Sequence, residues 1–283
     1  MSKILLILIL FGLASAAFAD DWSLVWSDEF EKEGQPDSTK WDYEEGFVRN
    51  EESQYYTRAR LENARVENGM LVIEGRRESF ENPRFQPDDK DWRRARRSAD
   101  YTSAALITLD KASWRYGRVE VRAKLPHGKG VWPALWMMGE NRSKVGWPKC
   151  GEIDIMEFVG HDPDRVHATV HFPIEGKKHR SKGGKLKTKA PYEEFHVYAL
   201  EWTAERMDFF FDGTKYHTFN VDDAGAGADN PFRKPHYLLI NLALGGSWGG
   251  AIDDANLPQQ FLIDYVRVYE KKADAETKIK STE

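Results

Sequence analysis

Cysteine is almost absent from this sequence of 283 residues, in which Cys150 is the only one. An intramolecular disulfide is therefore excluded, and the stability of the folded chain has to come from its core. An excess of positive charge is also lacking, because 41 Lys and Arg stand against 46 Asp and Glu, giving a net charge of -5. Both signs are spread along the chain, which argues against nucleic acid as a partner.

Long apolar runs are missing except near the N-terminus, where residues 4–13 form one. This run is shorter than the roughly 20 residues that span a bilayer, and Asp20-Asp21 follows soon after it, so we expect no membrane anchor. Lys3 before the run and Ala17-Phe18-Ala19 after it are typical of a secretory signal peptide. We therefore expect residues 1–19 to be a signal peptide and the protein to be secreted, either extracellular or periplasmic.

Helical periodicity is rare after the N-terminus, and short β-prone runs separated by Gly, Pro and Asp-Gly turns take its place. This pattern predicts one all-β domain, a sandwich or a barrel, over residues 20–270. The expected strands cover residues 22–30, 66–73 as a hairpin around Asn68-Gly69, 104–109, 117–125, 131–138, 150–159, 166–172, 195–202, 207–211, 215–219, 237–244 and 262–269.

Three other segments are expected to lack regular strands. Residues 50–56 are polar and aromatic, which suits a loop or a cleft rim. Residues 76–98 are rich in Arg and Asp and have no period, which predicts a long surface loop; its basic run is balanced by nearby acids, so a solvated loop is favoured over a nucleic-acid site. Residues 271–283 form a charged tail that we expect to be disordered.

Tryptophan, by contrast, is abundant, with ten residues in the chain. In an open cleft, a Trp ring is a platform for the apolar face of a sugar. Alternation along residues 131–138 puts Trp132 and Trp136 on one face and Val131, Leu135 and Met137 on the other. In residues 166–172, the polar face carries His167, Thr169 and His171, which predicts a recognition surface beside the two Trp.

The segment Gly151–Phe158 is unusual because it puts three carboxylates, Glu152, Asp154 and Glu157, into an apolar strand. Simple alternation would drive Glu157 into the core with Ile153 and Ile155. A β-bulge between Asp154 and Glu157 reverses the alternation, so we predict that all three acids line one cleft. Cys150 is expected to be a small neighbour of Glu152 on the same side.

Hydrolysis of a glycosidic bond needs two carboxyl groups that face it, one as nucleophile and one as proton donor. Two Glu on one strand can approach the ~5 to 5.5 Å separation of retaining enzymes, so we predict retention of configuration. Spacing alone does not assign their roles. The alternatives are an edge strand with solvated acids and a calcium site, although the interleaved turn residues of a calcium loop are missing. A zinc pair of His167 and His171 is disfavoured, because i and i+4 lie roughly 13 Å apart along a strand.

Several segments together resemble glycoside hydrolase family 16, and within it the laminarinase-like endo-β-1,3-glucanases. They are Trp132-Pro-Ala-Leu-Trp136, Gly151-Glu-Ile-Asp-Ile-Met-Glu157, Ala168-Thr-Val-His171, Asn241-Leu-Ala-Leu-Gly-Gly246 and Asp264-Tyr-Val-Arg-Val-Tyr269. The resemblance implies a β-jelly roll of two antiparallel sheets with a concave substrate cleft. It also implies Glu152 as nucleophile, Asp154 as its helper through a hydrogen bond, and Glu157 as acid/base.

The resemblance further implies binding residues for a polysaccharide substrate. The expected sugar contacts are Trp132, Trp136, His171, Asn50, Glu51, Arg118, Trp147 and Trp248. Catalysis needs no cofactor in this family, but a structural calcium is common, and by position Glu29, Gly75 and Asp264 are its expected ligands. We also expect a monomer.

The favoured function is hydrolysis of β-1,3-glucan or mixed-linkage β-glucan. Hydrolysis of an algal galactan such as agarose or carrageenan is an alternative, since the same acid spacing occurs there. A non-catalytic glucan-binding module is disfavoured because all three acids are present. Transfer of the glycosyl group to a sugar instead of water would use the same residues.

Overall fold

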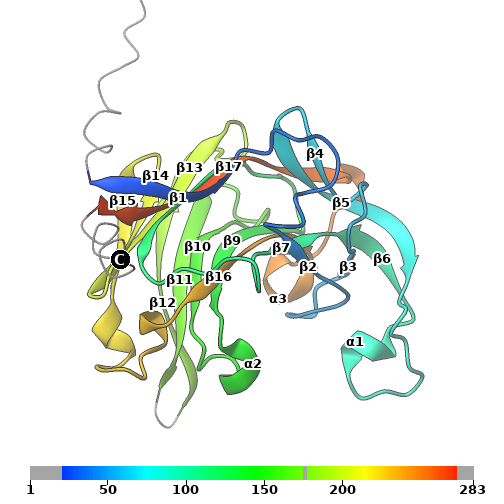
Figure 1. Ribbon diagram of the computed structural model, residues 1–283. Coiled ribbons are helices and arrows are strands. Elements are labelled where there is room, and N and C mark those ends of the chain that lie inside the picture. The colour runs from blue at the N-terminus through cyan, green and yellow to red at the C-terminus, as the bar shows by residue number, and fades with distance from the viewer. Residues whose placement is uncertain (1–20, 175–176, 273–283) are drawn as a thin grey trace, which may run out of the picture.

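The computed structural model describes residues 21–174 and 177–272 and consists of two stacked β-sheets (Figure 1). The expected signal peptide and all but the first two residues of the expected tail lie outside the described residues. Lys271, the first residue of the expected tail, continues the last strand and pairs with Trp22. No described helix is long and apolar enough to cross a membrane.

The seven-stranded sheet carries the cleft described below. Its strands, in spatial order, are β12 (Lys177–Lys187), β11 (Arg165–Ile174), β10 (Glu152–Glu157), β9 (Val131–Gly139), β16 (His236–Leu244), β7 (Ala105–Ile107) and β2 (Asp42–Glu44). Every neighbouring pair in it is antiparallel.

The second sheet has ten strands and packs against the first. Its main path is β15 (Thr214–Asn220), β14 (Arg206–Phe211), β13 (His196–Trp202), β8 (Gly117–Lys124), β17 (Gln259–Lys271), β5 (Met70–Glu81), β6 (Ser98–Ser103) and β3 (Gln54–Tyr56); β1 (Trp22–Asp28) pairs with β17 and β4 (Ala64–Glu67) with β5. Only β3 and β6 are parallel among the described pairs. The expected all-β sandwich is confirmed.

The described helices are all short and lie outside the sheets. They are α1 (Trp92–Ala95), α2 (Arg142–Val145) and α3 (Gly246–Gly249), with the 3₁₀ turns η1 (Val221–Ala224), η2 (Pro231–Arg233) and η3 (Asp254–Asn256). α3 follows β16 directly, so its position is fixed by a buried strand of the cleft sheet.

The core lies between the two sheets, and β9 shows how the sequence builds it. Val131, Leu135 and Met137 point into this core, where they pack with residues of both sheets. Trp136 and Met138 point to the opposite face. The alternation predicted for residues 131–138 is therefore confirmed.

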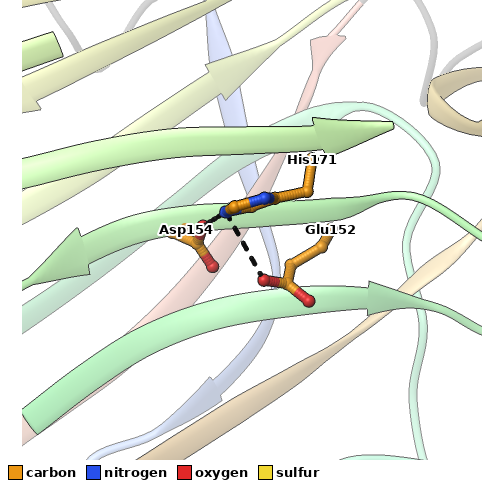
Figure 2. Close-up of side chains that lie close together, drawn as sticks. All are labelled: Glu152, Asp154 and His171. Carbon is orange, nitrogen blue, oxygen red and sulfur yellow. Dashed lines mark ion pairs between the residues drawn. The ribbon is translucent and has the colours of Figure 1, made fainter. Parts of the chain in front are cut away.

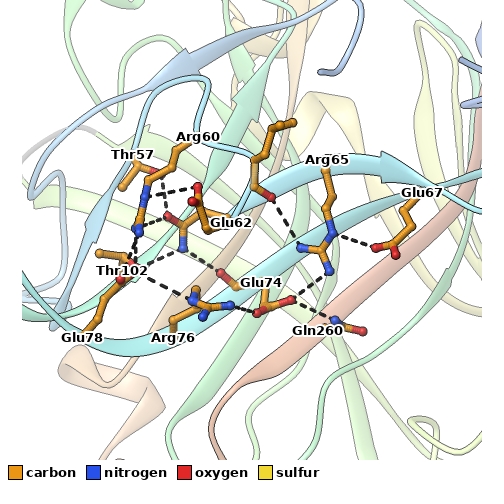
Figure 3. A network of polar contacts seen from close by, with 12 residues as sticks. Thr57, Arg60, Glu62, Arg65, Glu67, Glu74, Arg76, Glu78, Thr102 and Gln260 are labelled. Atoms are coloured by element: carbon orange, nitrogen blue, oxygen red, sulfur yellow. Dashed lines mark hydrogen bonds and ion pairs between the residues drawn. The ribbon is translucent and has the colours of Figure 1, made fainter. Parts of the chain in front are cut away.

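The prediction of a long loop over residues 76–98 is wrong at both ends. β5 continues to Glu81 and pairs with β6 across a bulge between Arg77 and Phe80. This part of the strand was not predicted because its exposed positions carry charged side chains. In the structure these side chains form hydrogen bonds and ion pairs with one another. Glu78, in the part of β5 that was expected to be a loop, accepts hydrogen bonds of 2.5 and 2.9 Å from Arg60 (Figure 3).

Two other segments also differ from expectation. Residues 177–187 form β12, an edge strand that was not predicted because Lys, Arg, His and Gly dominate it. Lysine-rich edges are a common protection against pairing with other chains. Residues 54–56 form the buried strand β3, so only the residues before it lie at a rim.

The packing of Leu135 generates a test of the core. Leu135→Ala should lower the free energy of unfolding by about 2–5 kcal/mol, because Leu135 is fully buried between the sheets. Leu24→Ala is the matched control, since this side chain is 54% exposed, and should change stability by less than ~0.5 kcal/mol. Urea unfolding followed by Trp fluorescence measures both; equal losses would contradict the assignment of the core.

Candidate active site

β10 carries the acidic cluster, which we define as Glu152, Asp154 and Glu157. Gly151, just before it, has φ of +79°, and a Cβ there would lie 2.8 Å from Pro231, so only glycine lets the chain enter the strand at this point.

The predicted bulge is present. The register with β11 shifts between Asp154 and Glu157, and the register with β9 shifts between Asp154 and Met156. As a result, Ile153 and Ile155 are buried in the core while the acidic cluster faces outward. One irregularity in pairing thus separates the apolar from the acidic side chains of a single strand.

The acidic cluster lines a cavity of about 630 Å³ on the outer face of the seven-stranded sheet, which we call the cleft. The predicted face of β11 joins it, with His167, Thr169 and His171 in register opposite Glu157, Asp154 and Glu152, respectively. Further lining residues are Arg49, Asn50, Glu52, Trp132, Ala134, Trp136, Met138, Arg142, Trp147, His179, Asn241 and Trp248.

His171 lies between two of the acids (Figure 2). Its Nε2 is 3.3 Å from Asp154 Oδ2 and 3.8 Å from Glu152 Oε1. A hydrogen bond from Asp154 to Glu152 was predicted, but none is present among the described contacts. The imidazole of His171 instead connects the two carboxyl groups, which gives it a more central place than the substrate contact predicted from the sequence.

Two indole groups hold the two Glu of the acidic cluster. Trp147 Nε1 donates a hydrogen bond of 2.9 Å to Glu152 Oε2, and Trp132 Nε1 donates one of 3.1 Å to Glu157 Oε1. Trp147 is exposed and Trp132 is nearly buried, so one donor stands at the mouth of the cleft and the other at its wall. Both rings also offer apolar surface for a sugar.

The surroundings of the two Glu are electrostatically different. Burial raises the pKa of Glu157 well above its ordinary value, and the charge of Asp154 adds to the rise. Burial also raises the pKa of Glu152, but the positive charges of His171 and Arg49 and the hydrogen bond from Trp147 oppose this. Glu152 is therefore better equipped to hold a negative charge, and Glu157 to hold a proton.

Asp154 is the most deeply buried member of the acidic cluster, with a side chain that is 4% exposed. Burial and the charge of Glu152 raise the pKa of Asp154 well above its ordinary value. Since the charge of Asp154 in turn raises the pKa of Glu157, ionisation of one acid disfavours ionisation of the next. The three carboxyl groups thus share fewer negative charges than three separate acids would carry.

Trp136 lines the cleft and is held in place by two consecutive buried hydrogen bonds. Its Nε1 donates to Asn241 Oδ1 at 2.7 Å, and Asn241 Nδ2 donates to the hydroxyl of Tyr56 at 3.0 Å. The guanidinium of Arg49 lies 4.8 Å from the centre of the Trp136 ring and forms an ion pair with Glu44. Arg49 and Asn241 were not predicted as site residues, although each is next to or within a segment that the sequence singled out.

The rim residue Glu51 was predicted incorrectly. Asn50 lines the cleft as expected, but Glu51 is exposed and does not line it, while Glu52 does and is almost fully buried. Asn50 and Glu51 both have positive φ, at 55° and 52°, so the chain turns sharply and brings the next side chain inward. Glu52 accepts hydrogen bonds from Gln54 at 2.8 Å and Asn50 at 3.3 Å.

Arg118 was also predicted as a sugar contact and does not lie in the cleft. It belongs to β8 in the ten-stranded sheet, where it donates to Glu201 at 2.7 Å and to Glu120 at 2.8 Å. Cys150, by contrast, packs as predicted on the cleft side, with its Sγ 3.4 Å from Met138 Sδ, although it is fully buried.

Two of the three residues expected to bind calcium, Glu29 and Asp264, have arginine partners in the structure. Arg267 holds the Glu29 carboxylate through two hydrogen bonds of 2.9 and 2.8 Å, and Arg122 donates to Asp264 at 2.5 Å. Gly75 pairs with Gln259, five residues before Asp264 on β17. The two carboxylates are thus engaged by arginines, and the structural calcium with its expected ligands stays a prediction.

One group of side chains in the described part of the chain is compact enough for a cation. Glu152, Asp154 and His171 each offer an atom within 4.8 Å of the others. The same atoms also suit proton transfer and attack on a sugar, because two carboxyl groups and an imidazole serve either purpose.

Residues 52–267 match the model of "Glycosyl hydrolases family 16". The chain is 45% identical to a β-glucanase of Rhodothermus marinus over 264 residues, covering 89% of this chain and 86% of that one. The laminarinase structure from Rhodothermus marinus aligns with a TM-score of 0.77 at 44% identity, over 88% of this chain and 98% of the other.

A second solved structure is described in connection with endo-acting O-glycanases of the human gut microbiota that initiate mucin breakdown. It aligns with a TM-score of 0.84 at 38% identity, over 90% of this chain and 93% of the other. These alignments confirm the jelly-roll sandwich. The chain belongs to glycoside hydrolase family 16, and it is a glycoside hydrolase of the endo-1,3-β-glucanase type.

Proposed function

We propose that this protein is a secreted enzyme that cleaves β-1,3-glucan of the laminarin type, or mixed-linkage β-glucan, within the chain and with retention of configuration. The observation that carries the proposal is the unequal environment of Glu152 and Glu157 on one bulged strand. The laminarinase from Rhodothermus marinus, which is similar over nearly the whole described chain, supports the choice of substrate.

In the first step, the Glu152 carboxylate attacks the anomeric carbon and forms a covalent glycosyl ester. Glu157 gives its proton to the glycosidic oxygen, so the bond breaks and the leaving sugar departs with a new hydroxyl group. The raised pKa of Glu157 helps it to keep this proton until it is transferred. Trp147 and His171 stabilise the charged nucleophile until it reacts.

In the second step, Glu157 is ionised and takes a proton from water as that water attacks the ester, and Glu152 leaves as a carboxylate. Loss of the charge on Glu152 during the first step makes ionisation of Glu157 easier, because the charge of Glu152 is one of the causes that raise its pKa. No step needs a metal or cofactor. We also propose that residues 1–19 direct secretion and that the enzyme acts as a monomer.

A second substrate class is supported by one observation. The structure described with mucin O-glycanases aligns with a higher TM-score, 0.84, than the laminarinase, 0.77. A β-linked host glycan is therefore the second candidate, and a galactan such as agarose or carrageenan would use the same two carboxyl groups.

The proposal predicts the outcome of a substrate panel. Purified protein, assayed with excess EDTA, should release short oligosaccharides of retained β configuration from laminarin and lichenan, with little release from mucin O-glycans, agarose or carrageenan. Glu152→Gln should lower kcat on the order of 10³-fold or more, because it removes the nucleophile, while laminarin binding persists. Glu193→Gln, an exposed residue outside the cleft, is the matched control.

Reducing-sugar assays and NMR of the first product measure these quantities. If the protein cleaved only another glycan of the panel, β-glucan would be the wrong substrate. A product of inverted configuration would refute the proposed mechanism. Activity abolished by EDTA and restored by a cation would show that the enzyme needs a metal, either at Glu152, Asp154 and His171 or at the expected structural calcium site.

The hydrogen bond from Trp147 to Glu152 generates a pH prediction. This bond lowers the pKa of Glu152, so Trp147→Phe should raise that pKa and leave the nucleophile protonated up to a higher pH. The acidic limb of the profile of kcat/KM on laminarin should therefore move upward by about 0.5–1 pH unit, the equivalent of one hydrogen bond. The alkaline limb, set by Glu157, should stay in place.

Trp22→Phe is the matched control, because it removes an indole outside the cleft, and it should leave both limbs of the profile in place. A uniform loss of activity with both limbs unmoved would show that Trp147 serves only as a sugar platform.

A further inference from the structure

His167 is a polar residue of the cleft to which the proposed mechanism gives no task. It lies on β11, directly opposite Glu157 in the register between β10 and β11. His171, the imidazole beside the nucleophile, is four residues further along the same strand, which is roughly 13 Å away. His167 therefore stands beside the acid/base and apart from the nucleophile.

The ring of His167 packs against one indole, which in turn packs against a second. It packs edge-on against Trp248, with centroids 5.1 Å apart and planes at 78°. Trp248 packs in the same way against Trp132, at 5.4 Å and 83°, and Trp132 donates its hydrogen bond to Glu157. A continuous set of contacts thus connects His167 to the carboxyl group that protonates the glycosidic oxygen.

One nitrogen of His167 has no partner in the described structure. Its Nε2 is buried and forms no hydrogen bond there, although the residue lines the cleft. Burial also lowers the pKa of His167, so the imidazole is neutral at neutral pH and can exchange a hydrogen bond with a hydroxyl group. A buried polar atom that lacks a partner is unfavourable, and a bound ligand removes that cost.

We propose that His167 binds a hydroxyl group of the sugar that leaves with the glycosidic oxygen, and thereby selects the sugar on the leaving-group side of the bond. This proposal rests on the proposed function. The glycosidic oxygen has to meet Glu157, and the departing sugar keeps that oxygen, so it must pass the side chains that surround Glu157. Of these, Trp132 and Trp248 offer apolar faces, and His167 offers an imidazole ring that can exchange hydrogen bonds.

The test compares two substrates that differ only in the leaving group: laminaritetraose, which has a sugar there, and a nitrophenyl β-laminaribioside, which has none. His167→Phe keeps a ring against Trp248 and removes the nitrogen. It should lower kcat/KM about 10-fold on the tetraose, the effect of one lost hydrogen bond to a sugar, and less than 2-fold on the nitrophenyl glycoside. His167→Gln, which restores a polar group, should recover part of the loss.

His217→Phe is the matched control, because His217 is also half-buried with an unpartnered Nε2 but lies on β15, outside the cleft. It should leave both substrates unaffected. Equal losses on both substrates, or no loss on either, would overturn the proposal, and thermal melting checks that each variant is folded. A wild-type enzyme inactive on both substrates would refute the proposed function, and the role of His167 with it.

Discussion

The cleft depends on a single break in strand pairing. Without the bulge after Asp154, the alternation of β10 would put Glu157 among the core residues that Ile153 and Ile155 join. A buried, unpaired carboxyl group in that core would be strongly unfavourable. With the bulge, the same strand packs its apolar side chains into the core on one face and presents both carboxyl groups of a glycosidase on the other.

The surroundings of the bulge then give the two Glu different tasks. Each Glu accepts one indole hydrogen bond. Burial raises the pKa of both, but the positive charges of His171 and Arg49 oppose this rise at Glu152, whereas the charge of Asp154 adds to it at Glu157. The two residues share a strand and a residue type, so the difference comes from neighbours on other elements. Asp154 is the link, because its charge opposes ionisation of Glu157 while its carboxyl group contacts the same imidazole as the nucleophile.

The sequence was most informative where alternation decides the outcome. The sandwich, the bulge, the two Trp of β9 and the polar face of β11 followed from the period of side chains along strands. It was least informative where three-dimensional contacts decide. Arg118 lies in the other sheet, Glu52 replaces Glu51 because two residues of positive φ turn the chain, and β12 was hidden by its charged composition. With β12, His179 was missed, which contacts Trp147 and His171 from that edge.

The central claim is that Glu152 forms the covalent bond to the sugar. It is tested most directly by incubating the enzyme with a 2-deoxy-2-fluoro-β-laminaribioside that carries a good leaving group, and by locating the trapped sugar through peptide mass spectrometry. The account predicts one label per chain, on Glu152. A label on Glu157 would exchange the two roles, and the absence of any labelled peptide in an enzyme that turns over glucan would contradict a covalent mechanism.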